Sequence, residues 1–272
     1  MLRVQVYDVF CDEKAQGNPC AVVLLETWLS NTALQGICLE LAQPVCCFIV
    51  LTDKTYFIRW FSSLGEINLC GHGSLAAGAA IIDSLNVDEV ALKSNYGDIA
   101  VLKQDGFYQM SLPSWQARPY PVDSLDPQLS RSAIAAFTTR DLILVLPSEE
   151  KLRAYEPDFE LIGQIEDYHA LIVTAQSGDN EYVLRYFAPK IGIAEDIATG
   201  SAQCSLAPYW FDKLDANELN VRQLSKLGGY FRVEKETPKS VLISAYVKAC
   251  NDKSRLMATH TNVTSSLIKR HL

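Results

Sequence analysis

The sequence predicts an α+β fold made of two pseudo-symmetric halves. Short strand-like runs outnumber helix-like runs, and one pattern of strand, glycine turn and helix start occurs twice along the chain. The 272 residues also correspond to roughly two units of ordinary domain size, each able to bury an apolar core. With 49% hydrophobic and 21% charged residues, the composition is that of a globular protein rather than a disordered one.

The strand-like runs are short stretches that alternate or carry β-branched residues. In chain order they are Val4–Phe10, Ala21–Leu25, Cys47–Leu51, Tyr56–Phe61, Ile99–Lys103, Leu142–Leu146, Ala170–Thr174, Tyr182–Phe187, Tyr230–Val233 and Val241–Val247. Helical spacing occurs in Leu34–Leu41, Ser74–Leu85 and Ala202–Leu214. Ser30 and Asn31 are candidate N-caps of the first helix.

The internal repeat begins with a strand that carries Tyr and Arg at the same places in both copies. Tyr56–Phe61 (YFIRWF) matches Tyr182–Phe187 (YVLRYF) with an offset of 126 residues. Each run is followed by a loop, a glycine motif and an apolar, alanine-containing segment. The glycine motif is Gly71–Ser74 (GHGS) in the first copy and Thr199–Ser201 (TGS) in the second. This shared order favours duplication over chance.

A proline cluster marks the expected boundary between the halves. Pro113, Pro119, Pro121 and Pro127 occur with Ser and Asp between them, which is typical of a crossover segment. We therefore expect an N-terminal half over residues 1–115, a C-terminal half over 116–248 and a polar tail over 249–272. The last strand-like run, near 241–248, is a candidate to join the N-terminal half.

Charge and composition exclude several classes of partner. A net charge of −8 and a pI of about 5.1 argue against a nucleic-acid-binding protein. The longest helix-like apolar stretch, Leu75–Ile82, is less than half of the ~20 residues that a membrane-spanning helix needs, so we expect no membrane partner. Eight cysteines without a CxxC pair, and a strand-like start of the chain, indicate reduced thiols in the cytoplasm. Phosphate-loop, dinucleotide and metal-ligand patterns are missing, so neither a nucleotide cofactor nor a metal is expected.

The two glycine turns form the candidate site. A glycine turn at a helix N-terminus presents unpaired N–H groups at the positive end of the helix dipole, which favour a carboxylate or a developing enolate. If Gly71–Ser74 and Gly200–Ala202 face each other, they would form an anion cradle for the carbanion that arises next to a carboxylate. Proton transfer on a small carboxylate would then need no cofactor.

Three reactive groups lie in or beside these turns. His72 titrates near neutrality and Asp196 offers a carboxylate, so both are candidates for proton transfer. Each also fits an ordinary structural role, His72 as a histidine at a helix start and Asp196 as a helix N-cap. Cys70 directly precedes the first turn, where a helix dipole lowers a thiol pKa, although a buried inert cysteine is more common.

Several short motifs follow one another in a characteristic order. They are Asp8–Phe10, Gly17–Pro19, Ala21–Val23, Arg59–Phe61, Glu66, Leu69–Ser74 and Asp196–Ser201. In this order they resemble the phenazine-biosynthesis PhzF-like family, which shares the diaminopimelate-epimerase fold. The resemblance covers about residues 1–248.

The resemblance implies two pseudo-symmetric halves, each a strongly curved, barrel-like β layer around a central helix, with the site in the cleft between them and often in a homodimer. It implies an isomerase or epimerase that shifts a proton on a small carboxylated substrate without metal or coenzyme. His72 and Asp196 match the family's catalytic positions. The positions that match its substrate-binding segments are Asn18, Gly71, Gly73, Ser74, Thr199, Gly200 and Ser201.

One departure from the family pattern concerns its proton-shuttling glutamate. The family carries this residue in a Ser-Glu-Thr-x-Phe segment, where this chain has Pro44–Phe48 (PVCCF), so that Val45 occupies the glutamate position. Valine cannot move a proton. The neighbouring Cys46 would point to the opposite face of a strand. Two alternatives follow: altered chemistry that uses His72, Asp196 and Cys70, or a protein that keeps the pocket as a small-molecule binder or scaffold.

Overall fold

The structure is a computed structural model that describes residues 3–68 and 70–250. The chain divides into two compact units. Unit 1 contains the described residues of segments 1–11, 18–110 and 245–272, and unit 2 contains residues 12–17 and 111–244. The expected tail, 249–272, lies outside the described residues from 251 onward. In the described part of the chain, no helix is both long and apolar enough to cross a membrane.

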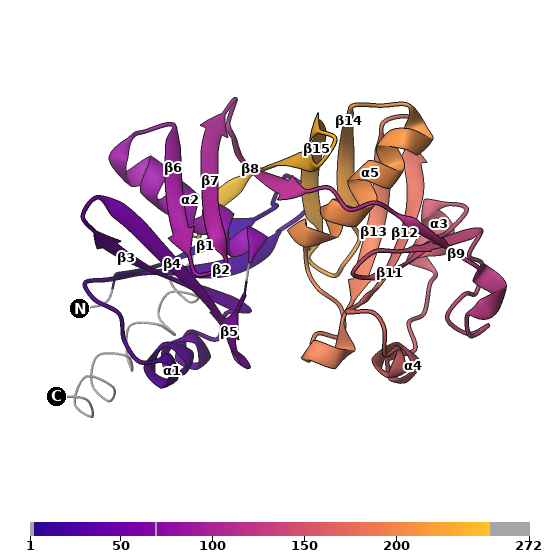
Figure 1. Ribbon diagram of the computed structural model, residues 1–272, viewed down its shortest axis with the longest axis horizontal. Coiled ribbons are helices and arrows are strands. Elements are labelled where there is room, and N and C mark those ends of the chain that lie inside the picture. The colour runs from indigo at the N-terminus through magenta and orange to yellow at the C-terminus, as the bar shows by residue number, and fades with distance from the viewer. Residues whose placement is uncertain (1–2, 69, 251–272) are drawn as a thin grey trace. The chain divides into compact units, whose positions relative to one another are not determined.

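In its described residues, unit 1 is a curved sheet with two helices (Figure 1). Its elements are β1 (Arg3–Val9), β2 (Asn18–Leu25), α1 (Asn31–Leu41), β3 (Val45–Thr52), β4 (Thr55–Ser62), β5 (Gly65–Ile67), α2 (Gly71–Leu85), β6 (Glu89–Ser94), β7 (Gly97–Gln104), the first part of β8 (Phe107–Pro113), and β17 (Val247–Ala249). The strands pair in the order β17, β1, β2, β3, β4, β6, β7 and β8, with β5 beside β4. The β2–β3 and β4–β6 pairs are parallel and the others are antiparallel.

Unit 2 repeats this arrangement. Its elements are β9 (Arg118–Tyr120), η1 (Val122–Ser124), β10 (Ala135–Thr138), β11 (Leu142–Val145), α3 (Glu149–Arg153), α4 (Phe159–Gln164), β12 (Leu171–Gly178), β13 (Glu181–Phe187), η2 (Pro189–Ile191), η3 (Gly200–Ala202), α5 (Gln203–Leu214), β14 (Glu218–Gln223), β15 (Gly229–Thr237) and β16 (Ser240–Ala245). The strands pair in the order β9 to β16, and β11–β12 and β13–β14 are the parallel pairs. The same sequence of parallel and antiparallel pairs in both units confirms the duplication.

The two copies exchange their last strands. β9 follows β8 of the first copy in the chain, yet it pairs with β10 in unit 2. β17 follows β16 of the second copy, yet it pairs with β1 in unit 1. Each sheet is therefore completed by a strand that comes from the other copy's sequence.

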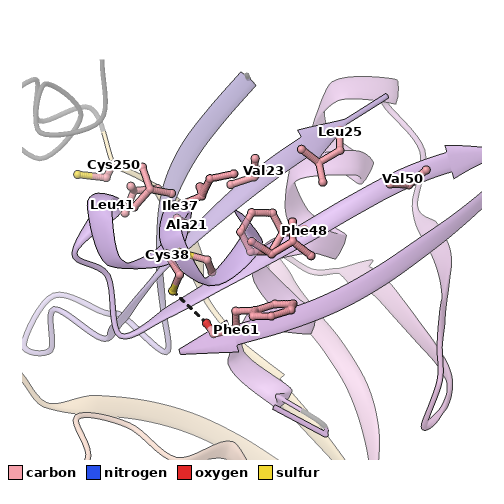
Figure 2. Close-up of a cluster of buried hydrophobic side chains, with 13 residues drawn as sticks. Ala21, Val23, Leu25, Ile37, Cys38, Leu41, Phe48, Val50, Phe61 and Cys250 are labelled. Atoms are coloured by element: carbon pink, nitrogen blue, oxygen red, sulfur yellow. Dashed lines mark hydrogen bonds between the residues drawn. The ribbon is translucent and has the colours of Figure 1, made fainter. Parts of the chain in front are cut away.

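Helix α2 is the central helix of unit 1, because it is apolar on nearly all sides and packs against β1, β2, β3, β6 and β7. One glycine lets a strand approach closely: a Cβ on Gly78 would lie 2.5 Å from Cγ1 of Val101 in β7. Helix α1 covers a second apolar layer, in which Phe48 and Phe61 meet edge to face (Figure 2). Ser30 caps α1, as expected, since its Oγ accepts a hydrogen bond from the Ala33 amide.

The sequence patterns did not predict strands β6, β10 and β14. β14 carries a charged or polar residue at every second position, β6 begins and ends with charged or polar residues, and β10 has only four residues. Each is paired on both sides: β6 with β4 and β7, β14 with β13 and β15, and β10 with β9 and β11. Pairing with these neighbours, rather than local composition, makes these segments strands.

Candidate functional site

The first glycine turn starts helix α2. Cys70 is the N-cap residue, and the first hydrogen bonds of the helix run from the Ser74 amide and Ser74 Oγ to the Cys70 carbonyl, at 2.9 and 2.7 Å. The amides of residues 71–73 precede these bonds and are therefore the donors that a helix start offers to an anion. Gly73 is required by packing, since a Cβ there would lie 2.6 Å from Cys47 Sγ and 2.8 Å from Trp60 Cδ1.

His72 lies in this turn as a neutral base. Its Nδ1 is 3.4 Å from Cys70 Sγ. Its Nε2 is buried and has no hydrogen-bond partner among the described residues, although the residue as a whole keeps some exposure. Burial lowers the pKa of His72 to about 4, so the imidazole is uncharged at neutral pH and can accept a proton.

Val45 begins strand β3, with Cys20 of β2 opposite it. Side chains alternate along a strand, so Val45 and Cys47 share one face and Cys46 has the other. Cys47 Sγ donates to the Gly73 carbonyl at 3.1 Å and lies 3.2 Å from Cys20 Sγ, whereas Cys46 packs in the apolar layer under α1. Burial raises the pKa of the Cys47 thiol, so this thiol is a packing group.

Asn18, which the family resemblance assigns to substrate binding, is the first residue of β2. It is paired with Val9 of β1 and is 1% exposed. It lies two residues before Cys20, whose sulfur contacts Cys47 and through it the first turn. Unit 1 thus brings Asn18, Cys70 and the residues of the first turn onto neighbouring elements.

The second glycine turn, in unit 2, holds Asp196 in a network of hydrogen bonds. Thr199 Oγ1 donates to Asp196 Oδ2, and the Asp196 amide donates to the Tyr186 carbonyl at 3.0 Å. Gln223 donates to the Asp196 carbonyl and accepts from the Thr199 amide, each at 2.8 Å. Asp196 is not a helix N-cap, since Thr199 caps η3 and Ala202 precedes α5.

Arg140 contacts the second glycine turn, and no sequence pattern indicated this contact. Its Nη2 donates to Ser201 Oγ at 3.3 Å and to the Tyr186 hydroxyl at 3.2 Å. Its Nε and Nη2 also reach both oxygens of Asp141, at 3.2 and 2.8 Å. Arg140 follows a four-residue strand that was not expected, and only the pairing of β10 with β11 brings it to the second turn.

A matched ion pair precedes each glycine turn. Glu66, five residues before Gly71, binds Arg59 of β4, and Glu195, five residues before Gly200, binds Arg185 of β13. The duplication therefore extends from the strand order to individual side-chain contacts. Each pair ties the loop in front of a turn to the adjacent strand.

The chemistry available is that of proton transfer and anion binding. Unit 1 supplies His72, Cys70 and the amides of residues 71–73, and unit 2 supplies Asp196, Ser201 and Arg140. Within residues 3–68 and 70–250, no group of three or more His, Cys, Asp or Glu side chains could hold a metal ion.

Known proteins resemble this chain over almost its whole length. The family model of phenazine biosynthesis-like proteins, PhzC-PhzF, matches residues 7–245. An uncharacterized isomerase of Vibrio cholerae is 52% identical, with 91% of this chain and 89% of that protein covered.

Solved structures agree with this. The crystal structure of a putative phenazine biosynthesis PhzC/PhzF protein from Clostridium difficile has a TM-score of 0.85 at 30% identity, covering 92% of this chain and 97% of the other. A predicted epimerase from Pseudomonas aeruginosa has a TM-score of 0.69 at 20% identity, covering 92% and 97%, and shares the fold. The chain belongs to the PhzC-PhzF, phenazine biosynthesis-like, family.

Proposed function

We propose that this protein is an isomerase or epimerase that moves a proton on a small carboxylated substrate without a coenzyme. The observation that carries the proposal is His72, an uncharged imidazole whose buried Nε2 lacks a partner among the described residues, at the start of α2 beside unpaired amides. Relatives of this chain are named isomerases, which supports the same class of reaction.

The proposed reaction breaks a C–H bond on a carbon conjugated to the substrate carboxylate. The electron pair of that bond passes into the carboxylate as an enolate, and backbone amides of the glycine turns hold the developing negative charge. The proton moves to a protein base and returns to the other face of the same carbon or to another carbon of the conjugated system. We assign the proton transfers to His72 and Asp196, and substrate binding to Asn18, Gly71, Gly73, Ser74, Thr199, Gly200 and Ser201.

Cys70 has a secondary part in this proposal. Its sulfur is 3.4 Å from His72 Nδ1, and when Nδ1–H donates to this sulfur, Nε2 carries no hydrogen and can accept a proton. Val45 cannot replace the glutamate of the family pattern, and the thiols nearest to it are packing groups. The proposed mechanism therefore uses His72 where the family pattern has a carboxylic acid.

A second candidate function is a small-molecule binder or scaffold. The observation that favours it is again Val45, buried at the position where the family pattern has its proton-shuttling acid. Such a protein would bind carboxylates at the glycine turns and exchange no carbon-bound hydrogen. The family resemblance further supports a homodimer, and eight cysteines without a CxxC pair support the cytoplasm as the compartment. Light scattering and cell fractionation would test these two proposals.

Hydrogen exchange separates the two candidates. The protein is incubated in deuterated water with a panel of amino acids and unsaturated carboxylates, and mass spectrometry follows deuterium at carbon. The isomerase proposal expects exchange that falls by about 100-fold or more in His72→Gln and in Asp196→Asn. Exchange should stay unchanged in Asp53→Asn, which alters an exposed carboxylate in the turn between β3 and β4. Binding without exchange in the wild type would favour the binder, and Val45→Glu would then be the variant expected to gain exchange.

A further inference from the structure

The strand registers allow positions in the two units to be matched. In unit 1, Cys20 of β2 lies opposite Val45 of β3. In unit 2, Leu142 of β11 lies opposite Leu171 of β12. Val45 and Leu171 are separated by 126 residues, the offset already found between the two repeated strands. Cys20 therefore corresponds to Leu142.

Two residues before Cys20 and Leu142 lie Asn18, the first residue of β2, and Arg140, in the loop between β10 and β11, so this count matches Asn18 with Arg140. Asn18 is the residue that the family resemblance assigns to substrate binding beside the first turn. Arg140 holds the equivalent place beside the second turn, where its guanidinium contacts Ser201 Oγ and the Tyr186 hydroxyl. The neutral amide of Asn18 in the first copy is thus replaced by the cationic guanidinium of Arg140 in the second.

The Arg140 guanidinium is held in a fixed orientation. Its Nε and Nη2 bind the two oxygens of Asp141, whose side chain is fully buried. Its plane lies over the Trp115 ring, 5.2 Å from the ring centre. Because these contacts come from three directions, binding a ligand requires little further ordering of the side chain.

One edge of this guanidinium remains available. Nη1 has no partner among the described residues, and 36% of the side chain is exposed. A counter-ion for Asp141 alone would not need the contacts with Ser201 and Tyr186. Nη1 carries two N–H donors on a permanent cation, and a charge-assisted hydrogen bond from such a group is strong enough to recognise a carboxylate.

We propose that Arg140 binds a second carboxylate of the substrate, so that this protein selects dicarboxylates over monocarboxylates. This inference rests on the proposed function in that it concerns the same substrate. The first carboxylate occupies the amides of a glycine turn, and the second meets the open edge of Arg140.

A binding experiment with matched ligands tests the inference without any turnover. Dissociation constants are measured by NMR titration for malonate, succinate and glutarate, and for the half-amide of each, which has the same shape with one carboxylate fewer. The wild type is expected to bind at least one diacid about tenfold more tightly than its half-amide, the effect of a charge-assisted hydrogen-bonded pair.

The variants separate recognition from folding. Arg140→Gln leaves the buried Asp141 unpaired and is expected to lower stability, so Arg140→Gln combined with Asp141→Asn removes both charges and keeps a hydrogen-bonding pair. This double variant is expected to bind each diacid and its half-amide equally. Arg153→Gln, which removes an exposed arginine of unit 2, is the control and keeps the wild-type preference.

Two outcomes overturn the inference: wild-type protein that binds no diacid more tightly than its half-amide at any of the three lengths, or a preference that survives in the double variant. Neither outcome depends on hydrogen exchange at carbon. Exchange without diacid preference would refute the role of Arg140 alone, and diacid preference without exchange would refute the isomerase proposal alone.

Discussion

The guanidinium of Arg185 donates two hydrogen bonds to the carboxylate of Glu195, from Nε to Oε1 at 2.7 Å and from Nη2 to Oε2 at 3.1 Å. The remaining Nη1 donates to the Tyr155 carbonyl at 2.7 Å, and the guanidinium lies 4.9 Å from the centre of the Phe187 ring. Since Glu195 directly precedes Asp196, this arginine connects the residue assigned to proton transfer with β13 and with the segment that follows α3.

Removing this ion pair is expected to weaken unit 2. Both side chains are largely buried, at 14% and 24% exposure, so Glu195→Gln should lower the free energy of unfolding by about 1–3 kcal/mol. Glu149→Gln is the matched control, because Glu149 pairs with the exposed Arg153 and its loss should cost about 0.5 kcal/mol or less. Urea unfolding measures both, and equal losses would contradict the assignment.

The two glycines of the first turn are expected to differ sharply in their tolerance of a methyl group. Gly73→Ala would place a Cβ within 2.8 Å of Cys47 Sγ and Trp60 Cδ1, and should destabilise the protein by about 1–3 kcal/mol. Gly71→Ala meets no atom within 4 Å and should leave the melting temperature nearly unchanged. A melting temperature lowered equally by both changes would show that the close packing at Gly73 is not what the turn requires.

His72 is expected to make the protein less stable in mild acid. In the unfolded chain this histidine takes up a proton near the ordinary histidine pKa of 6.5, whereas the folded residue does so only near its pKa of about 4. Between these values the unfolded state binds more protons, so stability falls as the pH drops from 6.5 to 4, by at most about 3 kcal/mol. NMR titration of the His72 Hε1 signal gives the pKa directly. Urea unfolding at pH 4.5 and 7 should show a smaller difference in His72→Gln, and an unchanged difference would count against the shift.

The absence of a side chain at Gly229 is expected to fix the position of the loop that carries Asp196. A Cβ at Gly229 would lie 2.6 Å from the Ala198 Cβ, so Gly229→Ala must push back the segment between Asp196 and Thr199. We expect hydrogen exchange at carbon to fall by about tenfold or more while the protein remains folded. Gly163→Ala, in α4, meets no atom within 4 Å and should leave exchange unaffected. If Gly229→Ala kept the wild-type rate of hydrogen exchange at carbon, the position of this loop would not control activity.

The sequence reveals much of the fold because the repeated motif carries local signals. Tyr56–Phe61 and Tyr182–Phe187 are strands with strong β propensity, and the glycines after them start α2 and η3 followed by α5. These signals come from neighbours in the chain, so they can be interpreted without the fold.

Features that depend on pairing between distant segments could not be predicted. Arg140 reaches the second turn only because β10 and β11 form a hairpin, and β9 belongs to unit 2 only because it pairs with β10. Glu195, the carboxylate that binds Arg185, is likewise identified by its contact rather than by a sequence pattern. Hydrogen bonds between strands and ion pairs across loops join residues that no local pattern connects.

The exchange of terminal strands sets an order of events during synthesis. Strand β1 leaves the ribosome long before its partner β17, so one edge of β1 stays unpaired while all the residues between these two strands are made. Unit 2 ends at residue 244 and can close earlier. A nascent chain that terminates before Val247 would keep this open edge permanently and would be prone to associate with other copies of itself.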